Sequence, residues 1–376
     1  MRIVTVLNSL GMGGAEKLAL AVAERMARRG HDVALLSLMP RLPEQWPTTL
    51  PVTYLDMRKN PASVAAGFRR GRHFLREYRP DLVHSHSFHA NILARLLTIG
   101  VPGVPRAVVI SSVHNVYEGG WMRMLAYRLT DRWTVRTVAI SQAAAERFVR
   151  LKAIPKHKCC VRALGIDTQK FAPDAERRAS TRKTMRADAT FVWLCAGRIA
   201  PAKDYPNLLR AFAKVEQRRI DTRLWIAGGG SDGAREELES LASDLGICEK
   251  VHFLGLQRDM PALLDAADGF ALGSAWEGLP QVIAEAMAME RPVVATDVGG
   301  VREMLGEQCR RIGGTLVPAK DPEALAAAMV ATMRRNKDEG MLEGEAARDR
   351  IQRRFSIDAV ADGWEALYEQ EVGNRE

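Results

Sequence analysis

The sequence lacks the features of a membrane-spanning or secreted protein. Its longest apolar stretches, such as residues 192–196, have the length of a strand and fall short of the roughly 20 apolar residues that a spanning helix needs. The 5 cysteines form no CxxC pair and no regular framework, which argues against a disulfide-stapled fold and indicates reduced thiols. A strand pattern follows Met1 at once and leaves no space for a signal peptide, so we expect a cytoplasmic protein.

Acidic residues are scarce in the first part of the chain. Residues 1–165 carry 25 lysines and arginines against 10 acidic residues, whereas the remainder is net negative and the whole chain has a formal net charge of +9. A basic half beside an acidic half predicts an anionic partner for the basic half. Nucleic acid, an anionic membrane surface and a phosphorylated acceptor all fit this pattern. A solubilising surface is the alternative that charge by itself leaves open.

Two series of short β-branched runs alternate with helical patterns along the 376 residues, which is typical of βαβ units and parallel sheets in two domains. A polar segment, residues 173–190, separates the two series, and we place the boundary between Gly165 and Thr190. Because ligands bind beyond the carboxyl ends of parallel strands, two such domains facing each other predict a site between them. The expected strands are residues 3–7, 32–38, 52–55, 82–85, 107–111 and 137–140, then 191–196, 223–227, 251–254, 269–272, 292–296 and 315–317.

Glycine-rich turns follow a strand in each half. Gly13 and Gly14 stand between the first expected strand and the first helix, where backbone N–H groups can contact a phosphate; a plain turn is the alternative. Gly228, Gly230 and Gly233 form the GxGxxG pattern of dinucleotide sites. The next expected strand has no acidic residue at its tip to bind a ribose, so we reject a nicotinamide-dependent oxidoreductase.

Two basic residues follow the first expected strand of the second half. Arg198 and Lys203 lie in one strand-to-helix loop, which suits the neutralisation of a diphosphate. Plain surface charge is the alternative, but a position just before a helix favours phosphate binding.

The segment GSAWEGLPQVIAEAMAMERPVV carries two carboxylates around a helix start. Pro280 fits the first turn of this helix, and Gly278 and Leu279 present free N–H groups at its N-terminus. Glu277 precedes the helix, and Glu285 lies just over a turn inside it. Carboxylates accept hydrogen bonds from hydroxyls while a helix N-terminus attracts phosphate, so the segment predicts a ligand with both groups. A structural salt bridge is the alternative for either glutamate alone.

The order of GGAE, of GR with a following lysine, and of EGLP with two glutamates eight positions apart resembles glycosyltransferase family 4, which has the GT-B fold. The likeness covers nearly the whole chain. It implies an α/β protein with two Rossmann-like, doubly wound domains facing a cleft: an acceptor-binding domain at residues 1–165 and a nucleotide-sugar-binding domain at residues 166–355. A C-terminal helix at residues 356–376 would cross back to the first domain.

The resemblance also implies roles for candidate residues. His114 and Glu277 are the catalytic candidates near the transferred sugar. His86 is the acceptor-binding candidate on a different ground, because its segment ends a strand that faces the expected cleft. Glu285 would hold the ribose of the donor. The donor-binding candidates are Gly13, Gly14, Arg198, Lys203, Leu256, Gly278, Leu279, Pro280 and Glu285.

Two positions depart from the family pattern. The chain reads ALGID at residues 163–167, where the family commonly has Pro-Asn-Gly before Ile or Val and Asp. Leucine has neither the hydrogen-bonding side chain of asparagine nor its tolerance of left-handed turns, so the hinge geometry is left open. Tyr205 stands where many relatives have a small residue, which predicts a reshaped donor loop.

A metal site is not expected. His84, His86 and His89 in VHSHSFHA superficially resemble a metal cluster, but no cysteine or carboxylate joins them nearby. The chain also has no Asp-x-Asp, the pair that holds a metal in the other main glycosyltransferase architecture.

Residues 121–136 are expected to form one amphipathic helix. Trp121, Leu125 and Leu129 share one face, and the arginines at positions 128, 132 and 136 share another, which suits a helix lying on a membrane surface. An ordinary amphipathic helix on a basic domain is the alternative.

We therefore expect a retaining, metal-independent glycosyltransferase without a cofactor, peripheral on the inner face of the membrane. Its partners would be a UDP-linked sugar donor, an anionic lipid-linked or polysaccharide acceptor and an anionic membrane. A nucleotide-sugar epimerase is the alternative, but it would give the basic half no acceptor to bind. We expect no nucleic acid partner, because such a partner does not explain Glu277 and Glu285 and the chain has none of the common nucleic-acid-binding patterns.

Overall fold

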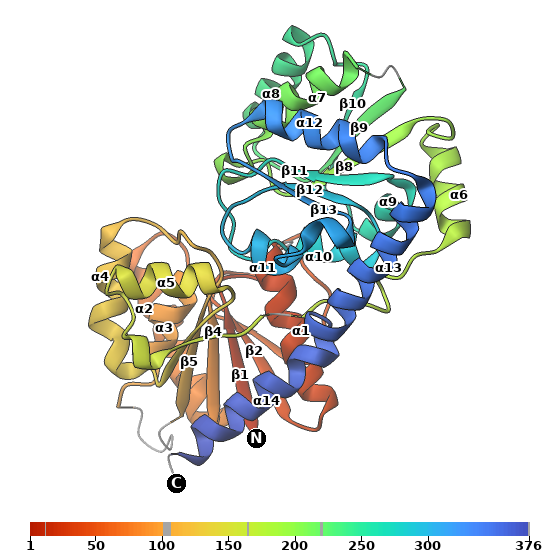
Figure 1. Ribbon diagram of the computed structural model, residues 1–376. Helices are drawn as coiled ribbons and strands as arrows, with labels where there is room; N and C mark the ends of the chain where they lie inside the picture. The colour runs from red at the N-terminus through yellow and green to blue at the C-terminus, as the bar shows by residue number, and fades with distance from the viewer. Residues whose placement is uncertain (12, 101–106, 164, 219–220, 375–376) are drawn as a thin grey trace. The chain divides into compact units, whose positions relative to one another are not determined.

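The chain, seen in a computed structural model, forms two compact α/β units (Figure 1). The structure describes all residues except 12, 101–106, 164, 219–220 and 375–376. Unit 1 comprises Met1–Ile166 and Phe355–Glu376, and unit 2 comprises Asp167–Arg354. The chain therefore leaves unit 1 and returns to it at its last helix, as the family resemblance implies. The sequence places the domain limits at residues 165 and 355, and the ligand-binding roles of the domains stay predictions.

The described part of unit 1 contains a 7-stranded parallel sheet. Two inner strands of this sheet, β4 (Leu82–His86) and β5 (Val108–Val113), are buried along their whole length, as expected for a parallel sheet that helices cover on both faces. In pairing order the strands are β3 (Val52–Tyr54), β2 (Asp32–Ser37), β1 (Arg2–Leu7), β4 (Leu82–His86), β5 (Val108–Val113), β6 (Arg136–Ala139) and β7 (Cys159–Val161). The α-helices are α1 (Gly14–Arg28), α2 (Pro61–Tyr78), α3 (Phe88–Leu97), α4 (Trp121–Thr130), α5 (Gln142–Arg150) and α14 (Ile357–Gly373).

The described part of unit 2 contains a 6-stranded parallel sheet. Its core includes Trp193 and Trp225, which are 0% and 1% exposed on neighbouring strands. In pairing order the strands are β10 (Val251–Gly255), β9 (Thr222–Ala227), β8 (Phe191–Ala196), β11 (Gly269–Leu272), β12 (Val293–Thr296) and β13 (Gly314–Val317). The α-helices are α6 (Ala175–Thr184), α7 (Tyr205–Glu216), α8 (Asp232–Asp244), α9 (Met260–Ala266), α10 (Gln281–Ala288), α11 (Val301–Leu305), α12 (Pro322–Met333) and α13 (Lys337–Arg354).

Every strand expected from the sequence corresponds to a strand of the structure, and β7 is additional. The single helix expected over residues 121–136 is wrong. α4 ends at Thr130, the 3-10 turn η1 (Asp131–Trp133) follows, and β6 begins at Arg136. The hydroxyl of Thr134 donates to the carbonyl of Val109 at 2.8 Å and draws the chain into the sheet before a helix could continue.

The polar segment at residues 173–190 contains a helix that belongs to unit 2. Asp174 caps α6, because its Oδ1 accepts from the N–H groups of Glu176 and Arg177 at 2.9 Å each. Arg177 and Arg178 then reach the end of α9 and the residues that follow it: Arg177 Nε donates to Asp265 at 2.5 Å. The sequence shows no apolar period here because arginines, rather than apolar side chains, attach this helix.

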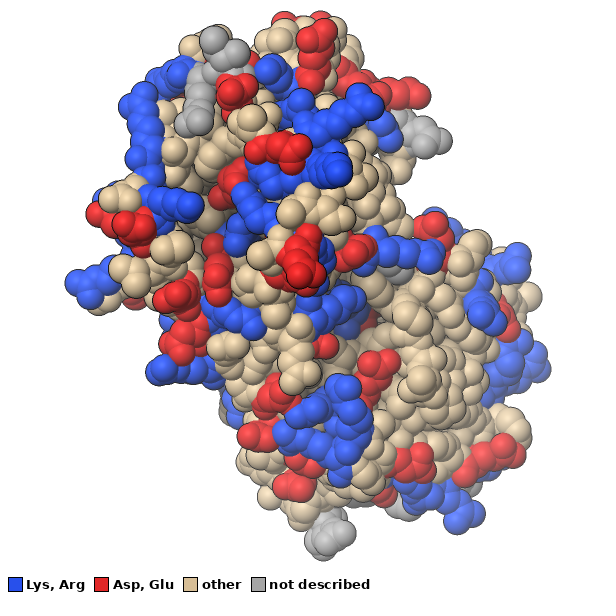
Figure 2. Space-filling model, turned by 90° about the vertical axis from the view of Figure 1, so that its right-hand side faces the viewer, with Lys and Arg blue, Asp and Glu red and all other residues tan. Residues whose placement is uncertain are grey.

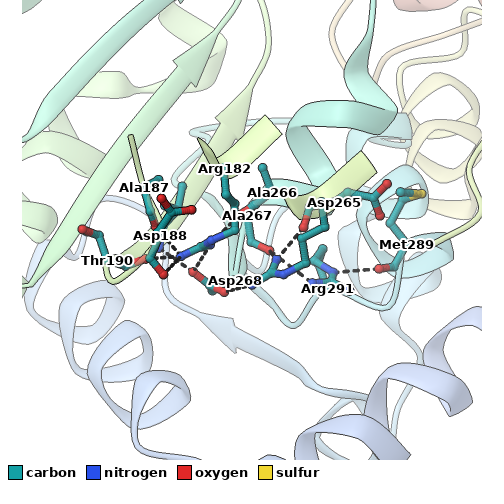
Figure 3. Close-up of polar contacts among 12 residues, drawn as sticks. Arg182, Ala187, Asp188, Thr190, Asp265, Ala266, Ala267, Asp268, Met289 and Arg291 are labelled. Carbon is teal, nitrogen blue, oxygen red and sulfur yellow. Dashed lines mark hydrogen bonds and ion pairs between the residues drawn. The ribbon is translucent and has the colours of Figure 1, made fainter. Parts of the chain in front are cut away.

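Arg182 is the most buried of these arginines, at 9% exposed (Figure 3). Its Nη1 donates to the carbonyl of Ala266 at 2.7 Å and to Asp268 at 2.9 Å, and its Nη2 donates to the carbonyl of Thr190 at 2.7 Å. Figure 3 shows Arg291 reaching the same stretch from the other side, where its Nη1 donates to the carbonyl of Ala267 at 3.2 Å. These two guanidinium groups and that of Arg178 together bind the carbonyls that precede β11.

The segment that leaves unit 1 and the segment that returns to it form backbone hydrogen bonds with each other. The N–H of Ile166 donates to the carbonyl of Phe355 at 2.8 Å, and the N–H of Ile357 donates back to Ile166 at 2.7 Å. A Cβ at Gly165 would lie 2.4 Å from the Cα of Ile357, so only glycine fits there. Leu164, where the sequence departs from the family pattern, lies outside the described residues.

Part of the basic excess of unit 1 is used within the unit. Arg25 of α1 and Arg29, the C-cap residue of that helix, form ion pairs with three acidic residues of α14, namely Asp358, Asp362 and Glu365. On the face of the molecule in Figure 2, basic and acidic side chains lie interspersed. These pairs attach the returning helix, so the net charge of this half is not wholly available to a ligand.

Candidate active site

The loops at the carboxyl ends of β8 and β9 pack backbone against backbone. Gly228 has φ +155°, and a Cβ there would lie 2.0 Å from the carbonyl oxygen of Gly197. The N–H of Ile199 donates to the carbonyl of Gly229 at 2.8 Å. A Cβ at Gly230 would lie 2.7 Å from the Cβ of Ile199. The first two glycines of the GxGxxG pattern are therefore required by loop packing, without any bound dinucleotide.

Lys203 and Glu277 form a buried ion pair at the same edge of the sheet. Lys203 ends the 3-10 turn η3 (Pro201–Lys203) after β8, and Glu277 lies in the loop after β11. Lys203 Nζ donates to Glu277 Oε1 at 2.6 Å, and the hydroxyl of Ser274 donates to the same oxygen at 2.6 Å. The two charged side chains are only 17% and 10% exposed. Burying an ion pair costs desolvation energy that an apolar pair would not, so this arrangement indicates a polar ligand site rather than a stabilising device.

Glycines after β12 support the Glu277 loop from the other side. Gly299 has φ +54°, and a Cβ there would lie 2.0 Å from the carbonyl oxygen of Glu277. The N–H of Gly300 donates to the carbonyl of Gly278 at 2.8 Å. Sequence reasoning missed this support and also missed Ser274. The sequence signal was the pair Gly299 and Gly300, shortly after the expected strand at residues 292–296, because paired glycines mark a close approach of two backbone segments.

The helix that follows Glu277 is α10, and it differs slightly from expectation. Pro280 is its N-cap residue rather than a member of the first turn. Gly278 is buried and Leu279 is 9% exposed, while Glu285, inside the helix, is 2% exposed. A buried carboxylate just inside a helix start remains consistent with a hydroxyl-binding role, which stays a prediction.

Arg198 and Leu256 also lie beyond strand ends of unit 2, after β8 and β10. Arg198 is exposed, and within the described residues it forms no hydrogen bond or ion pair, so its donors are available to an anion. Leu256 is 43% exposed. The structure therefore brings Lys203 and Glu277 into contact, whereas Arg198 and Leu256 lie exposed beyond the ends of their strands.

Tyr205, which was expected to reshape the donor loop, is 2% exposed at the start of α7. Its hydroxyl donates to the carbonyl of Gly197 at 2.6 Å. Tyr205 thus anchors the loop that carries Arg198 instead of projecting into it.

In unit 1 the structure brings three histidines together at the ends of β4 and β5. His86 Nδ1 and His114 Nε2 lie 3.0 Å apart and share one hydrogen. The ring of His84 lies on that of His86, with centroids 4.0 Å apart. His84 is held on both nitrogens, by the hydroxyls of Tyr368 and Ser112 at 2.7 Å each. His84 is therefore structural, whereas His86 and His114 each keep one ring nitrogen that has no hydrogen-bond partner in the described part of the chain.

Burial keeps these imidazoles neutral. It lowers the pKa of His84 to about 3 and that of His114 to about 4, and it lowers the pKa of His86 well below the usual 6.5. Since neither member of the His86–His114 pair is charged near neutral pH, the pair presents one N–H donor and one lone pair at its outer nitrogens, whichever way the shared hydrogen points.

Gly13 and Gly14 stand where the sequence placed them, between β1 and α1. Gly13 is the N-cap residue and Gly14 the first residue of the helix. The indole N–H of Trp46 donates to the carbonyl of Gly13 at 3.1 Å. Met12 between the glycines lies outside the described residues, and phosphate contact at this turn stays a prediction.

Within the described residues no three His, Cys, Asp or Glu side chains are placed to hold a metal ion. His89, the third member of the VHSHSFHA pattern, is exposed on α3. The described helices are also too short or too polar for any of them to cross a membrane.

The two parallel sheets with loops at their strand ends have the architecture of the GT-B fold. The solved structure of Alr3699/HepE from Anabaena, in complex with UDP and glucose, matches this chain with a TM-score of 0.86 at 20% identity. The match covers 98% of this chain and 100% of the other. This likeness establishes the fold.

The chain belongs to glycosyltransferase family 4: residues 12–170 match the Glycosyltransferase Family 4 model, and residues 190–335 match the model of Glycosyl transferases group 1. It is 30% identical to a D-inositol 3-phosphate glycosyltransferase of Saccharomonospora viridis, over 93% of this chain and 88% of that one. It is 26% identical to the UDP-Gal:alpha-D-GlcNAc-diphosphoundecaprenol alpha-1,3-galactosyltransferase of Escherichia coli, over 80% of this chain and 78% of that one.

Proposed function

We propose that this glycosyltransferase moves a sugar from a UDP-linked donor to an anionic lipid-linked or polysaccharide acceptor, with retention of configuration and without a metal. The observation that carries the proposal is the buried Lys203–Glu277 pair at the carboxyl end of the unit 2 sheet, beside the start of α10. A cation, a carboxylate and a helix N-terminus in one place suit a ligand with both phosphates and hydroxyls.

Lys203 can bind the diphosphate although it forms an ion pair with Glu277. Its ammonium group has three N–H donors, of which Glu277 takes one and leaves two for phosphate oxygens. Arg198, without a partner in the described residues, supplies a second cation after the same strand. Glu285 would hold the ribose, and Glu277 the hydroxyls of the transferred sugar.

The proposed reaction replaces one bond at the anomeric carbon. The bond from this carbon to the departing phosphate oxygen breaks, and a bond to the acceptor oxygen forms on the same face of the sugar. The acceptor proton passes to the departing phosphate. Lys203 and Arg198 would stabilise the negative charge that grows on the diphosphate, the task for which other enzymes use a metal ion.

The acceptor and location follow from unit 1 and from one relative. The Escherichia coli relative is named for a diphosphoundecaprenol-linked acceptor, which carries both phosphate and lipid. Unit 1 carries the basic excess of the sequence, and α4 exposes an apolar row. We place the enzyme in the cytoplasm, peripheral on an anionic membrane face.

Calorimetry of UDP and UDP-sugars in excess EDTA tests the donor site, with GDP and GDP-sugars as the other arm. We expect the uridine series to bind, and Arg198→Ala to weaken UDP binding about tenfold or more, because it removes a charge-assisted contact. Arg210→Ala is the matched control, since Arg210 is exposed on α7 of the same unit.

Three results would contradict parts of the proposal. Equal affinities for the Arg198 and Arg210 variants would remove the diphosphate role of Arg198. Binding confined to the guanosine series would overturn the uridine assignment. Sugar transfer that stops in EDTA and returns with manganese or magnesium would overturn metal independence.

A further inference from the structure

A carboxylate that the sequence analysis passed over controls the backbone beside His114. β5 ends at Val113, and the next N–H, that of His114, donates to Glu118 Oε1 at 2.9 Å. The hydroxyl of Tyr127 donates to the other oxygen, Oε2, at 2.6 Å. Glu118 therefore joins the loop after β5 to α4 through both of its carboxylate oxygens.

Each hydrogen bond from Ser85 through Asn91 and Tyr127 is donated towards Glu118. Asn91 Nδ2 donates to the carbonyl of Ser112 at 2.8 Å and to the Tyr127 hydroxyl at 3.0 Å, and the hydroxyl of Ser85 donates to Asn91 Oδ1 at 2.8 Å. A carbonyl can only accept, so Asn91 must present its amino group here. The Tyr127 hydroxyl accepts from Asn91 and is left to donate to Glu118. In this arrangement Glu118 accepts two bonds, one on each carboxylate oxygen.

Burial is the largest influence on the pKa of Glu118 and raises it above its usual value. The bonds from Tyr127 and from the His114 N–H, together with the charge of Arg123, act on this pKa in the opposite direction. Arg123 is held close because its Nη1 donates to the backbone carbonyl of Glu118 at 2.8 Å. A carboxyl group buried in this way costs desolvation energy, and its retention needs another reason.

The His86–His114 pair supplies that reason. Its shared hydrogen bond spans 3.0 Å, and the two outer nitrogens, His86 Nε2 and His114 Nδ1, are buried and have no partner among the residues that the structure describes. Buried polar atoms are nearly always satisfied, so these two point to a bound polar group. One donor and one lone pair match hydroxyl groups, and the match depends on the position of the His114 backbone.

We propose that Glu118 is a positioning residue, which fixes the backbone of His114 and thereby aligns the His86–His114 pair with sugar hydroxyls. This inference rests on the proposed function and adds Glu118, Tyr127 and Asn91 to it. The variants Glu118→Gln and Tyr127→Phe test it. Glutamine keeps the volume but offers one acceptor for two donors, and phenylalanine removes only the hydroxyl that binds Glu118.

We expect both variants to lower kcat about tenfold or more and to leave UDP affinity within twofold of the wild type, because unit 2 carries the nucleotide candidates. Hydrogen exchange at the His114 amide, measured without substrate, should rise in both. The double variant should lose little more turnover than either single variant, because the two residues act through one bond. A merely structural role would instead lower nucleotide affinity, turnover and melting temperature together.

Tyr117→Phe and Glu146→Gln are the matched controls. Tyr117 is 50% exposed, and Glu146 lies on α5, where its partner is the exposed Gln142. Faster exchange at His114 with wild-type turnover would overturn the proposal, as would unchanged exchange in both variants. A wild-type protein that transfers no sugar from any donor would instead overturn the proposed function, and the exchange data would still report whether Glu118 holds the loop.

Discussion

At the scale of single residues, the candidate site depends on a contact between two loops that are 74 positions apart. Sequence patterns placed Lys203 and Glu277 at strand ends and assigned them to opposite parts of the donor. They could not reveal that the two side chains are paired, because that pairing depends on the turn η3 and on Gly299, which lets the backbone after β12 lie against the carbonyl of Glu277. The pairing changes what each substitution should do.

Glu277→Gln and Glu285→Gln should therefore differ in nucleotide binding. Replacing Glu277 frees the Lys203 ammonium, so we expect UDP affinity to be retained or raised while turnover falls about tenfold or more, since the bonds to the sugar tighten in the transition state. Replacing Glu285 should weaken both UDP and UDP-sugar binding by about tenfold. Calorimetry and turnover, measured side by side, check this division. Identical losses in both quantities for the two variants would contradict it.

The unit 1 histidines show the same limit of sequence reasoning. His84 and His86 alternate along β4 and share a face, where their rings lie with centroids 4.0 Å apart at an angle of 44°. The sequence did not distinguish the fully bonded His84 from the half-bonded His86, because the partners of His84 come from β5 and from the last helix. Glu118 was missed because it lies in an irregular loop with no motif around it.

At the scale of elements, strands were easier to predict than helices. Apolar β-branched runs such as those of β1 and β8 are buried on both faces and read as strands directly. β7 was missed because its three residues, two of them cysteines, form no such run. α6 was missed because arginines, rather than apolar side chains, attach it to the rest of unit 2. The helix at residues 121–136 was predicted too long because Thr134 binds the sheet.

The packed loops after β8 and β9 make a sharp stability prediction. Gly228→Ala places a methyl group against the Gly197 carbonyl in a backbone conformation that alanine disfavours, so we expect roughly 3 kcal/mol lower unfolding free energy. Gly229→Ala is the control, because a Cβ there has no neighbour within 4 Å. Urea unfolding measures both variants. Equal stability would mean that the two loops can separate without cost.

α4 makes a prediction about membranes, although it is shorter than expected. Trp121, Met122 and Leu129 are 73%, 69% and 64% exposed, and beside them Arg128 and Lys152 line a hollow in unit 1. Leu129→Glu should reduce flotation with phosphatidylglycerol vesicles at any salt concentration, because it places a charge in the apolar row.

Leu342→Glu is the matched control for this test, since Leu342 is 68% exposed on α13 of unit 2. Lys152→Ala should weaken flotation only at low salt, where its charge is unscreened. Equal flotation of the Leu129 and Leu342 variants, or recovery with neutral vesicles as good as with anionic ones, would count against docking through α4.

At the scale of the whole molecule, the buried histidines predict an acid-sensitive fold. In the unfolded chain each histidine binds a proton near pH 6.5, whereas burial lowers the pKa in the folded protein to about 3 for His84 and about 4 for His114. Their full stability contribution is present above pH 6.5. It is lost as the pH falls below 6.5, at up to about 1.4 kcal/mol per pH unit for each histidine, until the folded form also takes up the proton.

Urea unfolding between pH 7.5 and 5 measures this loss. His114→Asn should have a shallower pH dependence than the wild type by up to about one proton. His73→Asn is the control, because the side chain of His73 is 69% exposed. A wild-type curve that is flat over this range, or two variants with the same slope, would show that the imidazoles are solvated.

The return of α14 to unit 1 has a consequence for how the chain is made. During synthesis the seven described strands of unit 1 leave the ribosome before unit 2, which is a continuous and compact segment of the chain. The hydroxyl that binds His84, and the tryptophan ring that packs against it, arrive only with α14. Unit 1 therefore exposes His84 and the rest of the surface that α14 covers until unit 2 has been translated. A product that stops after unit 2 keeps unit 2 complete but leaves that surface of unit 1 open to chaperones and proteases.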